Sequence, residues 1–75
     1  MIKVKKLEID FEIPDYLEKD INALCEAIEQ GALYDCEESE VYGSINMAMT
    51  SGEISVIQAD MLRDYYLNGG MWNNE

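Results

Sequence analysis

Carboxylates are the side chains of this chain with the most scope for chemistry, because its 75 residues carry 16 Asp and Glu against 5 Lys and Arg. Asp35, Glu37, Glu38 and Glu40 lie close enough in sequence to suggest a calcium site. A calcium loop needs Asp or Asn at alternate positions, a glycine and a distant bidentate Glu, and this segment lacks that order. Carboxylates at a helix start are stabilised by the helix dipole. We therefore interpret the cluster as an ordinary helix start.

The remaining reactive residue types do not form a catalytic or metal-binding pattern. The chain has no His, which removes the easiest general base near neutral pH, and Arg63 is its only Arg. No phosphate-binding loop or nucleophile elbow occurs. Cys25 and Cys36 stand eleven apart without a His or a second cysteine pair, so zinc lacks four ligands. We expect no enzyme activity, metal or cofactor, and a buried or half-buried free thiol at Cys25.

Composition excludes several classes of protein. A net charge of −11 conflicts with direct binding of nucleic acid or of anionic membranes, both of which need Lys and Arg. A hydrophobic fraction of 48% is too high for a disordered acidic tail. Glu8, Asp10 and Glu12 interrupt the apolar run that a signal peptide would need, and no segment approaches a membrane span. We expect a cytoplasmic protein.

The N-terminal part of the chain alternates apolar and acidic residues. The apolar positions are Leu7, Ile9, Phe11 and Ile13, and the acidic ones between them are Glu8, Asp10 and Glu12. This period of two predicts a β-strand over residues 7–13, ended by Pro14. A lone strand cannot satisfy its backbone groups, so its partner would be residues around Tyr34, the tail, or a second copy of the chain.

Three stretches after Pro14 have helical periodicity, at about 15–30, 37–50 and 55–67, followed by a tail over 68–75. Gly31 suits a left-handed helix end, and Ser55 with Gln58 has the spacing of a capping box. The positions that face inward are Leu17, Ile21, Leu24, Cys25, Ile28, Val41, Ile45, Ala48, Met49, Ala59, Leu62 and Tyr66. The sequence thus predicts a single small α+β domain over 1–75, mainly α, with three short helices and one N-terminal strand.

Some charged and aromatic residues stand where stability alone does not explain them. Glu26 and Glu29 lie near the C-terminal end of the first helix, where the dipole disfavours negative charge. Glu8, Asp10 and Glu12 would share one face of the strand. Among the aromatic residues, Tyr66 shares a stripe with Leu62, which leaves Tyr42 and Tyr65 as exposed contact anchors. We predict that these seven residues form a partner-binding surface.

The order strand, helix, helix over residues 7–50 resembles the ribbon-helix-helix family, with Leu7, Ile9, Phe11 and Ile13 matching its buried strand face. The resemblance implies a dimer whose N-terminal strands pair. In that family the outward strand residues read DNA bases, whereas the matching positions here are Glu8, Asp10 and Glu12. Such a surface repels DNA, pairing would set carboxylates opposite one another, and the third helix has no counterpart in the family.

Residues 52–67, GEISVIQADMLRDYYL, look like the short helical hairpins of small uncharacterised proteins from Gram-positive prophages and conjugative transposons. The size, the acidity and the Tyr/Asn-rich ending are similar to that group as well. The resemblance implies an accessory protein of a mobile genetic element and no defined activity.

We therefore expect a non-enzymatic protein that binds a partner protein through its acidic faces. The partner would carry a basic surface, such as one that normally binds nucleic acid, and the carboxylates would imitate phosphates there. The alternative is a structural or regulatory homodimer paired through residues 7–13, without DNA binding.

Overall fold

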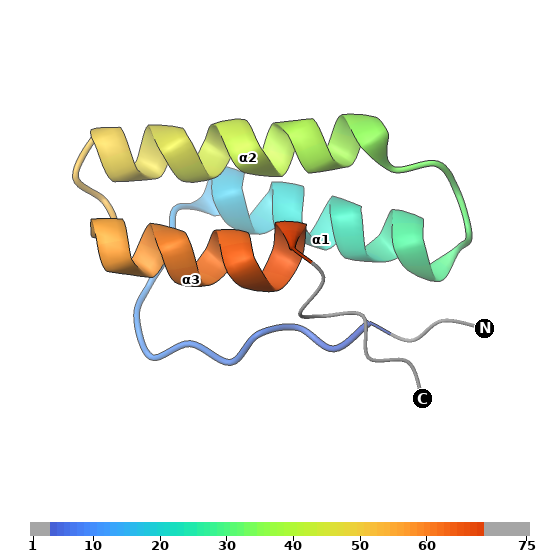
Figure 1. Ribbon diagram of the computed structural model, residues 1–75, viewed down its shortest axis with the longest axis horizontal. Helices are drawn as coiled ribbons and strands as arrows, with labels where there is room; N and C mark the ends of the chain where they lie inside the picture. Colours follow the sequence, from blue (N-terminus) through green and yellow to red (C-terminus); the bar gives the residue numbers. More distant parts are fainter. Residues whose placement is uncertain (1–3, 69–75) are drawn as a thin grey trace.

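The computed structural model describes residues 4–68 and places three α-helices in that range. They are α1 (Asp15–Glu29), α2 (Asp35–Thr50) and α3 (Val56–Leu67). Short connections join consecutive helices, so each runs antiparallel to the next (Figure 1). The helices begin and end within two residues of the predicted positions.

Local sequence explains where the helices begin and end. Ser55 caps α3 as predicted: its hydroxyl accepts from the Gln58 backbone N–H at 3.0 Å, and the Gln58 side chain accepts from the Ser55 N–H at 2.9 Å. Gly31 and Gly52 follow α1 and α2 with φ of 74° and 80°, a conformation that costs other residues steric strain. The ends of α1 and α2 thereby determine where the turn after each helix begins.

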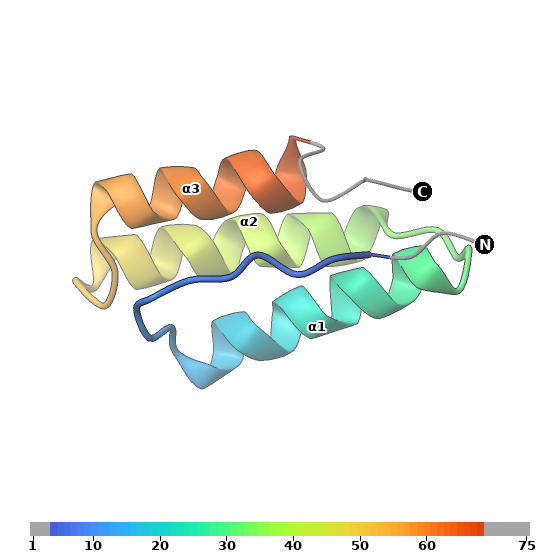
Figure 2. The same cartoon turned by 90° about the horizontal axis from the view of Figure 1, so that it is seen from below.

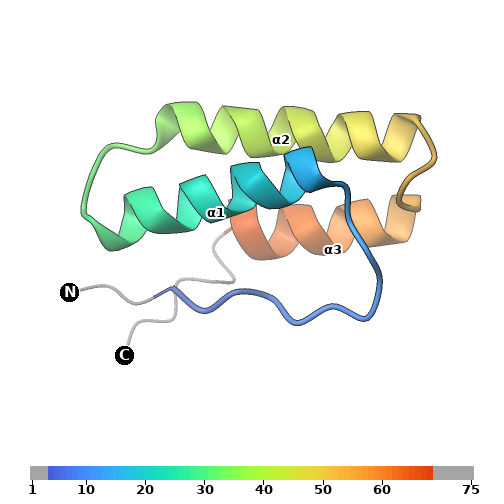
Figure 3. The ribbon, with the colours of Figure 1, turned by 180° about the vertical axis from the view of Figure 1, so that it is seen from behind.

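The helices are not packed equally against one another. The backbone of α2 lies close to both α1 and α3, whereas the backbones of α1 and α3 lie farther apart. Residues 4–13, which we call the arm, run along the α1 and α3 side of the bundle, opposite α2 (Figures 2 and 3). The arm thereby supplies the cover that α1 and α3 do not give each other.

The predicted N-terminal strand is wrong. Residues 4–13 are not part of any β-strand, and no strand occurs anywhere in residues 4–68, so the domain is a three-helix fold and not α+β. The alternation still marks one buried side: Leu7, Phe11 and Ile13 pack against the core, while the acidic residues between them are exposed. The arm also bends at Asp10 and Phe11. Helices, rather than a second strand, flank it.

The core matches the predicted helical stripes closely. Leu17, Leu24, Val41, Ile45 and Leu62 are its largest fully buried side chains, and no polar or charged side chain is buried among the described residues. Burying each such side chain contributes about 1.5–3 kcal/mol. Met49, predicted inside, is only partly buried and packs at the edge of the core. Cys25 is a free, buried thiol as expected, and Cys36 is exposed.

Replacing either of two glycines by alanine tests this fold, because the two substitutions should change the stability in opposite directions. Gly43 lies in the middle of α2, where an added methyl group would meet only open space, so Gly43→Ala should raise the free energy of unfolding by about 0.5–1 kcal/mol. Gly52→Ala should lower it by about 1–2 kcal/mol because of its positive φ. Urea unfolding measures both. Equal effects of the two substitutions would contradict the assigned helix end.

Candidate interaction surfaces

Side chains, not a β-ladder, hold the arm in place. The Leu7 backbone N–H donates to the Tyr66 hydroxyl at 3.0 Å, and the Tyr65 hydroxyl donates to the Lys5 carbonyl. On the α1 side, the Val4 N–H donates to Glu29 Oε2 at 3.1 Å. These bonds satisfy backbone groups that a lone strand would leave unpaired.

Two of the seven predicted site residues therefore have a structural function. The Tyr65 side chain is only partly exposed, its hydroxyl is engaged by the arm, and its ring meets that of Tyr66 edge-on at 5.0 Å. Glu29 accepts from the arm, which accounts for a carboxylate at the unfavourable end of α1. The sequence feature that could have indicated these contacts is the row of apolar residues in the arm, because such residues need cover from another part of the chain.

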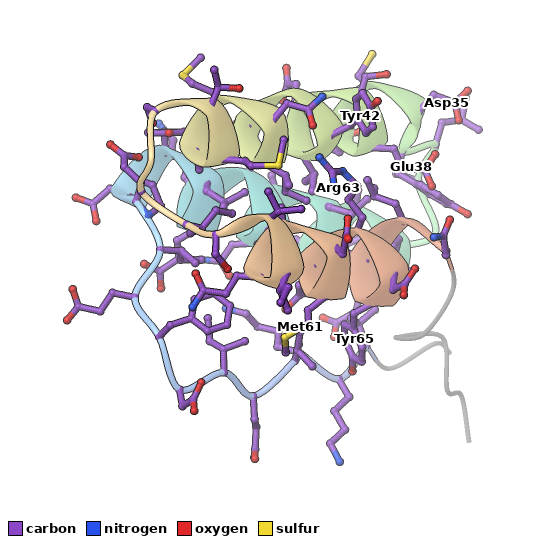
Figure 4. All side chains as sticks on the ribbon, turned by 60° about the vertical axis from the view of Figure 1, so that its left-hand side comes forward. Asp35, Glu38, Tyr42, Met61, Arg63 and Tyr65 are labelled. Carbon is purple, nitrogen blue, oxygen red and sulfur yellow. The ribbon has the colours of Figure 1, made fainter. Side chains whose placement is uncertain are left out.

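Glu26 and Tyr42 lie on the surface, on different helices. Glu26 is exposed and accepts from Gln30 Nε2 at 3.3 Å, so its charge meets no cation in residues 4–68. Tyr42 is 53% exposed on α2, and Figure 4 shows it near Asp35 and Glu38 at the start of that helix. The structure does not bring Tyr42 together with the carboxylates of the arm, which lies on the opposite side of the bundle.

Within residues 4–68, two groups of carboxylates have no side-chain hydrogen bond or ion pair. One is at the start of α2 (Asp35, Glu37, Glu38 and Glu40), and the other is on the arm. Glu8, Asp10 and Glu12 are exposed, and within the described chain none of them has a hydrogen bond or an ion pair. Asp15 and Glu18, in the first turn of α1, continue the row and are equally without such contacts. We call these five residues the acidic ridge. Sequence reasoning missed Asp15 and Glu18 because a helix start explains them locally.

A hollow of about 430 Å³ lies beside the acidic ridge, between the arm, α1 and α3. Its lining includes three acidic residues, Glu12, Asp15 and Glu18, and the apolar Ile9 and Phe11. Lys6 also lines it, with its Nζ donating to Asn22 Oδ1. Carboxylates around an apolar wall suit the side chain of Lys or Arg, whose aliphatic stem packs while its charged end pairs. The ridge and the hollow together can therefore receive cationic side chains.

Intramolecular cations neutralise very little of this acidity. Across residues 4–68 the structure contains one ion pair, between Arg63 Nη1 and Asp60 Oδ1 at 2.8 Å. Arg63 also donates to Asn46 Oδ1 at 2.6 Å, which ties α3 to α2. The described residues contain no group of three or more potential metal ligands. None of their helices combines the length and apolarity that crossing a membrane requires.

Burial beneath the arm changes the acidity of two groups. The pKa of the Cys25 thiol is raised, first by burial and further by the Glu29 carboxylate, while Lys6 opposes the shift. The pKa of the Tyr66 phenol is raised mainly by burial, although the Leu7 N–H bond acts in the opposite direction. A thiol that stays protonated reacts slowly, so Cys25 reports on whether the arm is in place.

Comparison with known proteins gives no match: no family model fits the chain, and neither curated proteins nor solved structures show significant similarity to it.

Removing the Tyr66 hydroxyl should loosen the arm. In Tyr66→Phe the Leu7 N–H loses its acceptor in a partly buried position, and we expect about 1 kcal/mol of destabilisation in urea. Labelling of Cys25 by a thiol reagent should become faster, whereas Tyr42→Phe, an exposed control, should change neither quantity. Unchanged Cys25 labelling in Tyr66→Phe would show that this bond does not hold the arm.

Stability should fall in alkaline solution. Groups whose pKa is higher in the native than in the unfolded state bind more protons when folded. The stability that such a group contributes is fully present below its unfolded pKa and is lost as the pH rises through its folded pKa. For Cys25 that loss starts at about pH 9, and for Tyr66 at about pH 10. The urea midpoint should therefore decline over this range, and less steeply above about pH 10 in Tyr66→Phe. A flat profile in both proteins would contradict the raised pKa values.

Proposed function

We propose that this chain is a non-enzymatic acidic protein that binds a basic surface of a partner protein, one that otherwise binds nucleic acid. The observation that carries the proposal is the acidic ridge: five exposed carboxylates that, within residues 4–68, have neither a cation nor a hydrogen-bond donor of their own chain. Charges without intramolecular partners remain available to an intermolecular one.

Such a chain would act in two ways: electrostatic attraction would steer it to the basic surface of the partner, and the bound chain would then occupy that surface. Each exposed ion pair contributes only about 0–1 kcal/mol, so one carboxylate does little alone. Several carboxylates acting together, on a chain with a net charge of −11, accelerate encounter with a basic surface and keep nucleic acid away from it. Such binding weakens as salt rises, because the charges are exposed. A mobile-element accessory protein, as the sequence resemblance implies, remains our proposal for its origin.

We favour this function over a homodimer paired through residues 7–13. The apolar side of the arm already packs against its own helices, and the exposed side is acidic, so two arms would set carboxylates against each other. Sedimentation of the pure protein distinguishes the two, since a chain that stays monomeric throughout the micromolar range is not a strand-paired dimer.

The ridge can be tested by competition for nucleic acid. A protein retained from an extract of the native source is purified, bound to fluorescent DNA, and titrated with this chain at increasing salt. We expect the chain to displace the DNA at low salt. The variant Glu8→Gln, Asp10→Asn, Glu12→Gln should displace it at least about tenfold less well, since each tenfold loss corresponds to only about 1.4 kcal/mol.

The matched control removes the same number of charges elsewhere. Glu37→Gln, Glu38→Gln, Glu40→Gln neutralises three carboxylates at the start of α2 and should retain displacement. Equal loss in both triple variants would show that net charge alone matters. Absence of displacement by the unmodified chain at low salt would refute the proposed function.

A further inference from the structure

Helix α3 is apolar on two faces, of which only one is covered. Ala59, Leu62 and Tyr66 are buried against the core, yet Val56, Ile57 and Met61 are 63%, 73% and 42% exposed. Half of the six exposed large apolar side chains in residues 4–68 thus lie on this one helix of 12 residues. A helix that is apolar on more than one side normally has partners on more than one side.

The outer apolar positions are regularly spaced and end in a hollow. Ile57 and Met61 are one helical turn apart, and a hollow of about 330 Å³ lies next to Met61, lined also by Leu7, Asp64 and Tyr65. Figure 4 shows Met61 and Tyr65 on the side of α3 that faces the arm, while Arg63 lies on the side toward α2. The hollow is therefore built jointly by α3 and the arm.

Two carboxylates border this apolar row. Asp60 and Asp64 are four residues apart, a spacing at which like charges destabilise a helix. Arg63 pairs with Asp60, but among residues 4–68 Asp64 accepts only from the Asn68 amide, at 3.0 Å, and the last turn of α3 has no basic residue. A negative charge there also opposes the helix dipole. The position of Asp64 therefore favours pairing with a cation of another molecule.

We propose that the outer face of α3 (Ile57, Asp60, Met61 and Asp64, with Leu7 and Tyr65 at the hollow) binds an amphipathic basic helix of a partner protein. The apolar side chains of that helix would cover Ile57 and Met61 and enter the hollow, and its Lys or Arg would pair with Asp64. This inference rests on the proposed function and goes beyond it, because it adds a contact surface separate from the acidic ridge and names the kind of basic segment that would bind there.

Two other kinds of occupant, a second copy of the chain and an extended peptide, fit this surface less well. A second copy of α3 would bring Asp60 and Asp64 against the same residues of its partner, between two chains that each carry −11. Residues 4–68 contain no β-strand whose ladder an extended peptide could lengthen. A helix satisfies its own backbone and presents apolar side chains at a matching spacing.

The test uses end-blocked Leu/Lys peptides of about 18 residues, long enough to form a helix. One peptide places Leu at helical spacing, and the other has the same composition with strict alternation, which favours a strand. Calorimetry at low salt should show binding of the helical peptide at least about tenfold tighter than that of the alternating one. Comparable affinities, or no binding of the helical peptide, would overturn the inference.

Two exposed methionines supply a matched pair of variants. Met61→Lys and Met47→Lys add the same charge, but Met47 lies on α2 and is 59% exposed. We expect Met61→Lys to weaken the helical peptide about tenfold and Met47→Lys to change it less than about threefold. Ile57→Ser, which changes no charge, should also weaken it. Circular dichroism confirms that each variant is folded.

The outcomes separate this inference from the proposed function. If Met61→Lys and Ile57→Ser bind the helical peptide as the unmodified chain does, the α3 face is not the docking surface. If, in addition, the unmodified chain still displaces DNA from its captured partner, the proposed function stands without the inference. If that displacement is absent, the function itself fails.

Discussion

The fold depends on the cover that the arm gives to α1 and α3. These two helices both pack on α2, and their backbones lie farther from each other, with the arm between them on the side opposite α2 (Figure 2). The arm places Leu7, Phe11 and Ile13 there. A small domain has few residues to spare for such cover, and loss of buried apolar surface removes a large share of a marginal stability.

This arrangement divides the surface by function. The inward side chains of the arm complete the core, and because alternate residues of an extended chain point in opposite directions, its acidic residues must face outward. The same segment therefore stabilises the fold and presents the acidic ridge. Helix α3 has a similar double use, since its tyrosines fasten the arm while its outer face keeps Ile57 and Met61 exposed.

The helices were predictable from sequence because their signals are local. Apolar spacing, the Ser55 capping box and the glycines at positive φ each act within one or two turns. The strand was mispredicted because a period of two shows that one side is buried without showing what lies beside the backbone. The contacts of Tyr65 and Glu29 with the arm were not predictable for a similar reason: their partners, Lys5 and Val4, are distant in sequence.

The contacts of the arm also join the two ends of the described chain. Leu7 meets Tyr66 across 59 residues, and Lys5 meets Tyr65 across 60. Contacts of such high sequence separation carry the largest loop-closure entropy, which slows folding. Removing residues 4–7 or residues 65–68 would break the same set of contacts, so these two segments, distant in sequence, depend on each other for their place in the fold.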